Sequence, residues 1–317
     1  MLTVSISSDD LINRLQADLA GPWRGRVEIV KWEMQAALPQ DTAARINAIV
    51  IGHYWEGNIN WDLLRLLPNL KLVQLPSAGF DHALPYVPQG AVLCSGRGVH
   101  SAETAELAIG LILAMQRGIA AARDHQREHR WAFEHLDSLI DRRVVLVGHG
   151  SVGQAIAHRL RAFDVDLVIV DRNPVFDDGS SKVFPVAELA TLVSNADILV
   201  LSVPLNVETR HLVDSRVLAA LPAGALVVNV ARGGVLDQDA LLAELQAGRL
   251  RAALDVTTPE PLPPDHPLWD APNLLITPHQ GGNTNAGYPR FAALVRRQIN
   301  HLLNDEPLEN VVRSTVG

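Results

Sequence analysis

The chain has 317 residues, 48% hydrophobic and 20% charged, with a net charge of −8. This composition is typical of a folded globular protein of about two domains, and the negative charge argues against nucleic-acid binding because phosphate backbones would be repelled. One cysteine, Cys94, excludes an internal disulfide and a cysteine-based zinc cluster, and we predict no metal site.

The chain opens without a cationic segment followed by an apolar one, so we predict no signal peptide. Its longest apolar stretch, Ala105–Met115, is about half of the ~20 residues that span a bilayer. We therefore expect a cytoplasmic protein that does not contact a membrane.

Short apolar strands alternate with helical segments in the first part of the chain. The predicted strands are Leu2–Ile6, Arg26–Val30, Ala48–Gly52, Lys71–Leu75 and Ala91–Cys94. The predicted helices are Asp9–Leu19, Thr42–Asn47 and Trp61–Leu67. This alternation is typical of a parallel sheet covered by helices, the α/β class.

A long helix is predicted from Ser101 to Arg117, with Ser101 as its N-cap. It is apolar nearly all round, which indicates burial between two bodies. The sequence then turns polar from Gln126 to Asp141, which suggests a domain junction there or shortly before it.

A second alternation begins at Arg143 and predicts a doubly wound sheet of six strands. These strands are Val144–Val147, Leu167–Val170, Ile198–Leu201, Leu226–Asn229, Ala252–Leu254 and Leu274–Ile276. The helices between them are Val152–Phe163, Pro185–Val193, Ser215–Ala220 and Gln238–Ala247, and Arg290–Leu303 is a final helix.

A glycine-rich loop follows the first strand of this second sheet. Gly148, Gly150 and Gly153 form a G-x-G-x-x-G pattern between a strand and a helix. Gly148 permits a tight turn, Gly150 lets the backbone approach a pyrophosphate, and Gly153 lets helix and strand pack closely. Ser151 and Val152 open the helix, whose free N–H groups would bind the phosphates. The alternative is a glycine-rich turn without a ligand.

Asp171 ends the next strand, 18 residues after Gly153. A carboxylate there accepts hydrogen bonds from the ribose hydroxyls of NAD and repels the 2′-phosphate of NADP. Arg172 could bind that phosphate, so NADP is the less favoured alternative to NAD.

Three polar residues have the chemistry that reduction of a 2-oxo acid requires. Arg232 follows the strand ending at Asn229 and could hold a carboxylate with two hydrogen bonds, although it could also form a surface ion pair. Glu260 lies in the segment after the next strand. His279 follows the last strand, at the edge where doubly wound sheets bind ligands, although a single histidine is more often structural.

The segments 148–153, 229–237, 254–261 and 277–282 together resemble the D-isomer-specific 2-hydroxyacid dehydrogenase family, in order and spacing. The family includes glyoxylate/hydroxypyruvate reductases and phosphoglycerate dehydrogenases. The resemblance implies that Arg232 and His279 bind the substrate, that His279 is the acid/base, and that Glu260 keeps its imidazolium available.

Further contacts are implied by the same resemblance. Backbone N–H groups in the turn Ser77-Ala78-Gly79 would hold the substrate carboxylate, unless this is a plain strand-to-helix turn. The cofactor would contact Val203, Pro204, Val230, Ala231, Asp255 and Gly282, with Asp255 accepting from the nicotinamide carboxamide.

The resemblance also implies the architecture. Residues 1–97 plus 284–317 would form a discontinuous, flavodoxin-like substrate domain, and residues 98–283 a Rossmann dinucleotide-binding domain inserted into it. The helix from Ser101 would belong to a homodimer interface, and the partner molecule would be a small 2-oxo or 2-hydroxy acid.

Departures from the family pattern leave some roles open. His149 lies where the family commonly has an apolar or aromatic residue, and Arg97 and His100 could be pocket or surface residues. Tyr54 and Trp55 could narrow the substrate pocket or cover a sheet edge. Two alternative functions are an NADH-sensing regulatory protein on the same scaffold, and a dehydrogenase for a different small anion such as phosphite or formate.

Overall fold

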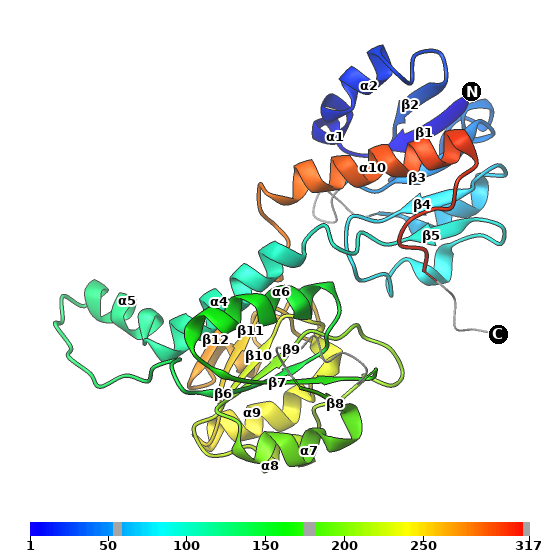
Figure 1. Ribbon diagram of the computed structural model, residues 1–317. Coiled ribbons are helices and arrows are strands. Elements are labelled where there is room, and N and C mark those ends of the chain that lie inside the picture. The colour runs from blue at the N-terminus through cyan, green and yellow to red at the C-terminus, as the bar shows by residue number, and fades with distance from the viewer. Residues whose placement is uncertain (53–58, 174–181, 313–317) are drawn as a thin grey trace. The chain divides into compact units, whose positions relative to one another are not determined.

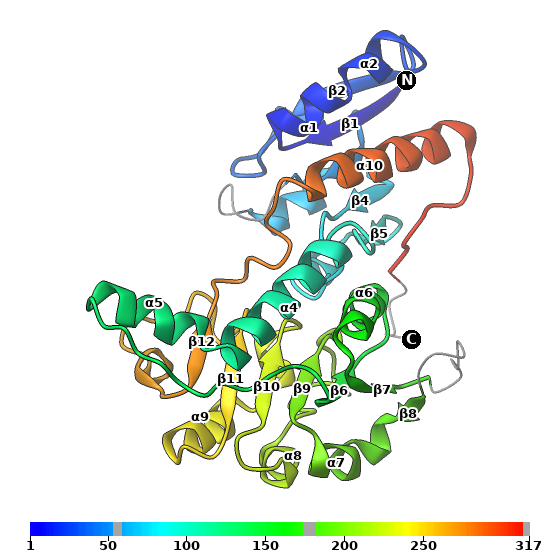
Figure 2. The same cartoon turned by 60° about the vertical axis from the view of Figure 1, so that its left-hand side comes forward.

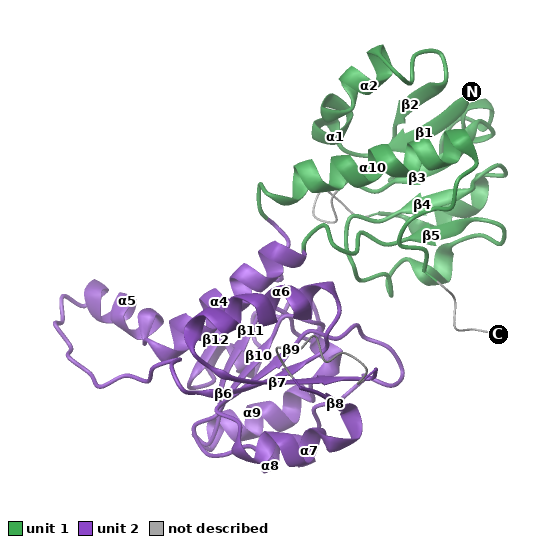
Figure 3. Cartoon of the chain, in the orientation of Figure 1, with its two compact units in different colours: residues 1–100, 284–317 green, residues 101–283 purple. Residues whose placement is uncertain are grey.

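The computed structural model describes residues 1–52, 59–173 and 182–312 of the chain (Figure 1). It divides into two compact units, unit 1 with residues 1–100 and 284–317 and unit 2 with residues 101–283 (Figure 3). Each unit contains one parallel sheet covered by helices, which confirms the predicted α/β class with two parallel-sheet domains.

The sheet of unit 1 has the strand order β2-β1-β3-β4-β5, and every strand pair is parallel. This is the flavodoxin-like order. Its strands are β1 (Leu2–Ile6), β2 (Val27–Lys31), β3 (Ile46–Val50), β4 (Leu72–Gln74) and β5 (Val92–Cys94). Its helices are α1 (Asp9–Arg14), α2 (Gln16–Ala20), α3 (Gln40–Ala43), α10 (Gly287–Asn304) and the 3-10 turns η1 (Trp61–Leu66) and η2 (Leu84–Tyr86).

Alternating side chains bury both faces of this sheet. Val4 and Ile6 of β1 join one apolar cluster with Phe291 and Val295 of α10. Ile49 belongs to the other cluster, together with residues of η1 and β4. The last helix of the chain therefore completes the core of the first unit, which explains why unit 1 is discontinuous.

The sheet of unit 2 has the order β12-β11-β10-β9-β6-β7-β8, again all parallel. Its strands are β6 (Arg143–Val147), β7 (Asp166–Asp171), β8 (Val183–Pro185), β9 (Ile198–Leu201), β10 (Leu226–Asn229), β11 (Arg251–Leu254) and β12 (Leu274–Ile276). Its α-helices are α4 (Ser101–Gln116), α5 (Ile119–Arg127), α6 (Ser151–Leu160), α7 (Leu189–Leu192), α8 (Ser215–Ala220) and α9 (Gln238–Gln246). Its 3-10 turns are η3 (Arg161–Phe163), η4 (Val186–Glu188), η5 (Val193–Asn195), η6 (Gly233–Val235) and η7 (Pro267–Asp270).

Two helical layers cover the sheet of unit 2, as Figures 1 and 2 show. Val144 and Leu146 of β6 pack into the layer of α4 and α6. Val145 and Val147 point to the opposite layer of α7, α8 and α9. Because successive side chains of a strand point to opposite faces, β6 is a continuous apolar run buried on both sides.

Several predicted boundaries were wrong. The polar stretch 126–141 is not a domain junction, because it lies within unit 2 and the units divide between residues 100 and 101. The sheet has a seventh strand, β8, which was not predicted and ends at Pro185, where the predicted helix was to begin. A strand of three residues is too short to show a period.

Two helices in unit 1 also differ from the prediction. The helix expected over residues 9–19 breaks at Leu15, whose N–H bonds to the carbonyl of Ile12 in a 3-10 pattern. The helix expected over residues 42–47 ends at Ala43, because Asn47 belongs to β3 and its side chain accepts the N–H of Thr3 at 3.0 Å.

Within the described ranges, no single helix is long and apolar enough to cross a membrane. Helices α4 and α5 meet that test of length and composition only as a pair, across a 63° bend.

Candidate active site

The glycine-rich loop connects β6 to α6 with a close-packed backbone. Gly148 has φ +101°, in the left-handed region that favours glycine. A Cβ on Gly153 would lie 2.0 Å from the carbonyl oxygen of Gly148. A Cβ on Gly150 would meet no atom within 4 Å, so the loop leaves open space in front of the N-terminus of α6. Ser151 and Val152 form the first turn of that helix. This arrangement fits a bound pyrophosphate.

Asp171 lies at the end of β7 beside this loop. One carboxylate oxygen accepts the N–H of His149 at 2.7 Å, and the other accepts the N–H of Asn173 at 2.9 Å. Arg172 forms an exposed ion pair with Glu208 at 3.2 Å. The carboxylate is thus held at the edge of the sheet, whereas the neighbouring guanidinium already has a partner.

The strand order reverses between β6 and β9, which is where doubly wound sheets bind ligands. Val203 and Pro204 follow β9, and Val230 and Ala231 follow β10. These four predicted cofactor-binding residues therefore lie at the carboxyl ends of strands beside the glycine loop.

His279 and Glu260 form the closest polar pair of the predicted catalytic set. His279 Nδ1 lies 2.7 Å from Glu260 Oε2, and Glu260 Oε1 accepts the N–H of Thr257 at 3.0 Å. The two side chains are 31% and 33% exposed, so both are shielded from water and still reachable. Burial alone would raise the pKa of Glu260, but the hydrogen bond and charge of His279 and the charge of Arg232 outweigh it and lower this pKa.

Asp255 holds the backbone on which His279 lies. It is only 2% exposed, and its carboxylate accepts the hydroxyl of Thr277 at 2.7 Å and the N–H groups of Gln280 and Gly281 at 2.9 Å each. Burial raises the pKa of Asp255 even though these donors act in the opposite direction. The backbone carbonyl of Asp255 also accepts the N–H of His279 at 2.7 Å. Gly282 follows this turn and is half-buried.

Arg232 lies after β10 on a loop that Asn229 organises. The buried amide of Asn229 accepts the N–H of Ala231 at 3.0 Å and donates to the carbonyl of Arg232 at 3.1 Å. Arg232 and Glu260 line the same shallow pocket of about 170 Å³, together with residues of the segments 233–234 and 257–259. The structure therefore brings all three predicted catalytic residues to the carboxyl edge of neighbouring strands of unit 2.

The predicted substrate turn lies in unit 1, after β4. Ser77 Oγ donates to the carbonyl of Gly79 at 2.5 Å, and the N–H of Gly96 donates to the carbonyl of Ser77 at 2.6 Å. Ala78 at the tip of the turn is exposed.

Four residues whose roles the sequence left open lie in unit 1 or outside the described ranges. Arg97 contacts Asn310 through its guanidinium at 3.3 Å and its carbonyl at 3.0 Å, and His100 is half-buried at the end of the unit. Tyr54 and Trp55 lie outside the described residues.

Sequence reasoning missed the residues that support the catalytic set. Thr277, Gln280 and Gly281 hold Asp255, and Gln238 contacts the loop before Glu260. Most of these contacts use backbone N–H or carbonyl groups. Because nearly every residue has these groups, the sequence gives no signal for such contacts. Among the described residues, no group of three or more His, Cys, Asp or Glu is arranged to bind a metal ion.

Comparisons with known proteins agree with these observations. A family model described as "D-isomer specific 2-hydroxyacid dehydrogenase, NAD binding domain" matches residues 109–281. The chain is 35% identical over 260 residues to a glyoxylate reductase of Thermofilum pendens, covering 78% of this chain and 76% of the relative.

Two solved structures are similar over almost the whole chain. One is a D-isomer specific 2-hydroxyacid dehydrogenase from Xanthobacter autotrophicus in complex with NADPH and MES, with a TM-score of 0.82, 29% identity and 98% coverage of both chains. The other is an NADPH-dependent glyoxylate/hydroxypyruvate reductase from Sinorhizobium meliloti with NADP and malonate. Its TM-score is 0.81, its identity 27%, and the match covers 99% of this chain and 97% of that one.

Proposed function

The chain belongs to the D-isomer specific 2-hydroxyacid dehydrogenase family, and from that premise we propose that it reduces a small 2-oxo acid, such as glyoxylate or hydroxypyruvate, to a D-2-hydroxy acid. This family membership confirms the resemblance inferred from the four sequence motifs. Members of the family are oxidoreductases, and so is this protein. The observation that carries the proposal is the 2.7 Å contact between His279 Nδ1 and Glu260 Oε2, on a strand edge that also bears Arg232.

Each residue has a definite task in this reaction. The nicotinamide cofactor supplies the hydride when bound. Arg232 binds the substrate carboxylate and polarises the 2-oxo group. Because Glu260 holds Nδ1, the Nε2–H of His279 faces the substrate and donates a proton to the oxygen that becomes the hydroxyl. The carboxylate of Glu260 stabilises the imidazolium before the proton is transferred.

Two further assignments complete the proposal. Residues 1–97 plus 284–317 supply the substrate turn Ser77-Ala78-Gly79, and residues 98–283 hold the cofactor. Its phosphates would lie on the glycine loop, Arg172 would flank its adenosine ribose, and its nicotinamide end would contact the segments 203–204 and 230–231 together with Asp255 and Gly282. The open space at Gly150 and the uncapped N-terminus of α6 support the placement of the phosphates.

A panel of substrates tests the function. We expect NADH to be oxidised with glyoxylate or hydroxypyruvate, faster than with branched or aromatic 2-oxo acids, and a chiral product to be the D isomer. Phosphite and formate are expected to give no reduction of NAD. Binding of NADH without turnover of any 2-oxo acid would favour a regulatory protein, and an L product would contradict the stereochemical assignment.

We propose NAD as the preferred cofactor, because the Asp171 carboxylate at the end of β7 would repel a 2′-phosphate. The preference for NADH is measured as kcat/KM with NADH divided by kcat/KM with NADPH. Asp171→Ala is expected to lower this ratio at least about tenfold. Steady-state kinetics with both cofactors measure this ratio. The control is Asp265→Ala, which removes an exposed carboxylate elsewhere in unit 2. Equal use of both cofactors by the wild type would contradict the role of Asp171.

We also propose that the protein is a homodimer that uses the arm of residues 117–136. Figures 1 and 2 show α5 and the loop after it standing away from the sheet of unit 2. Trp131 is 98% and Phe133 95% exposed, and α5 buries none of its residues. Aromatic side chains on a projecting segment are typical of protein interfaces.

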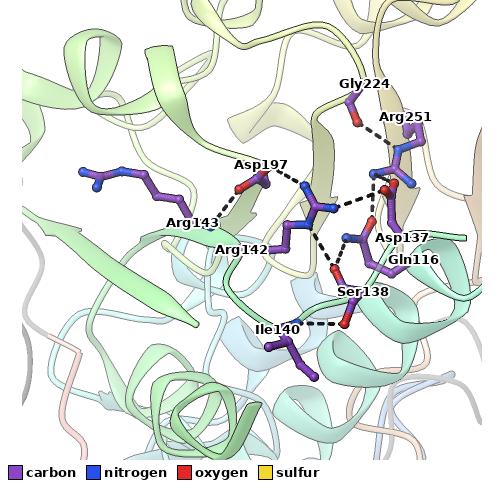
Figure 4. A network of polar contacts seen from close by, with 9 residues as sticks. All are labelled: Gln116, Asp137, Ser138, Ile140, Arg142, Arg143, Asp197, Gly224 and Arg251. Atoms are coloured by element: carbon purple, nitrogen blue, oxygen red, sulfur yellow. Dashed lines mark hydrogen bonds and ion pairs between the residues drawn. The ribbon is translucent and has the colours of Figure 1, made fainter. Parts of the chain in front are cut away.

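A polar network anchors the base of this arm (Figure 4). Arg251 contacts Gln116 at 2.7 Å and Asp137 at 3.3 Å, so it joins the two ends of the arm to the start of β11. Arg142 contacts Asp137 at 3.3 Å and Asp197 at 3.1 Å. The arm therefore projects from a fixed base, which reduces the entropy lost when it binds.

A second copy of the chain fits the arm as its partner. The arm carries four arginines and three carboxylates, whereas the whole chain has a net charge of −8. Its small net positive charge is therefore opposite in sign to that of the whole chain. In a two-fold dimer the same patch serves both copies.

Replacing Trp131 and Phe133 by serine is expected to convert the dimer into monomers. Burial of one aromatic anchor contributes about 2 kcal/mol or more, and each replacement removes one anchor from each copy, so it raises the dissociation constant about 900-fold. Analytical ultracentrifugation measures the change. Val207→Ser, at another 95% exposed apolar residue of unit 2, is the control. A double variant that dimerises as well as the wild type would assign the interface elsewhere.

A further inference from the structure

The loops that carry Arg232 and Glu260 touch through their backbones. A Cβ on Gly233 would lie 2.0 Å from the carbonyl oxygen of Thr257 and 2.4 Å from the hydroxyl of Thr258. Glycine at 233 therefore lets the chain after Arg232 lie directly against the chain before Glu260. To move as one rigid body, the two loops also need a hydrogen-bonded connection beyond this point of contact.

Gln238 provides such a connection. It is the first residue of α9, directly after the N-cap Asp237, and its side chain is half-buried. Its Nε2 donates to the carbonyl of Thr258 at 2.7 Å, and its Oε1 accepts the N–H of the same residue at 2.9 Å. One amide thus satisfies both backbone groups of Thr258, a two-point contact that allows little rotation or sliding. His266 Nε2 lies 3.4 Å from the same amide nitrogen.

The residue that Gln238 holds is adjacent to the residues that orient Glu260. Thr257 donates its N–H to Glu260 Oε1 at 3.0 Å and its hydroxyl to the carbonyl of Pro259 at 2.9 Å. The other oxygen, Oε2, contacts His279 at 2.7 Å. A shift of Thr258 would therefore move the donor that fixes one carboxylate oxygen and tilt the other away from the imidazole.

We propose that Gln238 is a positioning residue of this site, which aligns Glu260 with His279 and couples both to the Arg232 loop through the backbone of Thr258. This inference rests on the proposed 2-oxo acid reductase function. Gln238 acts through the loop and touches neither substrate nor cofactor, so its effect is on the geometry of proton transfer.

The test compares Gln238→Leu with Gln246→Leu, the same substitution at an exposed residue of the same helix. A displacement of about 1 Å at a catalytic group costs up to ~100-fold, so we expect kcat of Gln238→Leu to fall about 10- to 100-fold. The affinity for NADH should be unchanged, and Gln246→Leu should match the wild type. Gln238→Glu keeps the acceptor for the N–H of Thr258 and loses the donor to the carbonyl of Thr258. The kcat of this variant should therefore lie between those of Gln238→Leu and the wild type.

The pH profile separates positioning from a merely structural role. His279 faces Glu260 and its N–H bonds to the carbonyl of Asp255, while Arg232 lines the same pocket as Glu260. The attraction to Glu260 favours the imidazolium form of His279, which is the proton donor. Weakening this attraction should therefore move the alkaline limb of the pH profile for 2-oxo acid reduction to lower pH. Gln238→Leu should shift this limb in the same direction as Glu260→Gln, and by less.

Failure of the inference and failure of the function have different signatures. Wild-type protein that reduces no 2-oxo acid contradicts the proposed function, and the inference is then decided by NMR titration of the Glu260 carboxyl. Burial raises the pKa of this carboxyl, but the contact with His279 outweighs burial and lowers it, so the pKa should rise in Gln238→Leu. A variant whose melting temperature falls while kcat and the Glu260 titration match the wild type would overturn the positioning role.

Discussion

His279→Ala is expected to lower kcat for 2-oxo acid reduction about 10²- to 10⁴-fold, because a positioned general acid contributes about that much. The affinity for NADH should change little, since the imidazole lies at the carboxyl end of β12 and the glycine loop at the end of β6. Steady-state kinetics give kcat, and fluorescence titration of NADH gives the dissociation constant.

His158→Ala is the matched control for this experiment. His158 is exposed on α6 in the same unit, so its removal should leave kcat and NADH binding unchanged. Turnover of His279→Ala within a few-fold of the wild type would contradict the role of His279 as proton donor.

Arg232→Gln is expected to lower kcat/KM for the 2-oxo acid about 10²- to 10³-fold, the usual cost of losing one donor that stabilises developing charge. Arg232→Lys should recover only part of this loss, since an ammonium keeps the charge without the planar pair of N–H donors. The buried amide of Asn229 holds the backbone of this loop through groups that neither variant changes.

Arg216→Gln serves as the control, because Arg216 is exposed on α8 of the same unit. Comparing kcat/KM with the dissociation constant of NADH shows whether the loss is confined to the 2-oxo acid. An Arg232→Gln enzyme with an unchanged KM and kcat for glyoxylate would assign carboxylate binding to another group.

The position of the long apolar strands could be predicted from the sequence because burial leaves a local pattern. The run Val144–Val147 is apolar at every position, and the structure buries it on both faces as β6. A turn that requires glycine is equally local, since Gly148 has φ +101° and Gly153 has no room for a Cβ. Both features depend on a few neighbouring residues.

The arm of residues 117–136 could not be predicted in the same way. Its base is held by contacts such as Arg251 with Gln116, which are 135 residues apart, and Arg142 with Asp197, which are 55 apart. A polar, exposed segment resembles a linker in sequence. Only its anchoring to β11 and β9 shows that it belongs to unit 2.

The sequence by itself determined the α/β class, the glycine loop, the identity of Arg232, Glu260 and His279 as candidates, and the family. Each of these depends on local periodicity, on residue chemistry, or on the order of motifs along the chain. Those properties are present before the chain folds.

Only the tertiary structure decided how the candidates are held. Glu260 meets His279 across 19 residues of sequence, and Gln238 meets Thr258 across 20, because neighbouring parallel strands end at the same edge of the sheet. These partners are joined by side-chain and backbone hydrogen bonds of 2.7–3.0 Å, whose formation depends on where the strands place their ends. Such distances follow from the packing of whole elements, and no local pattern in the chain encodes them.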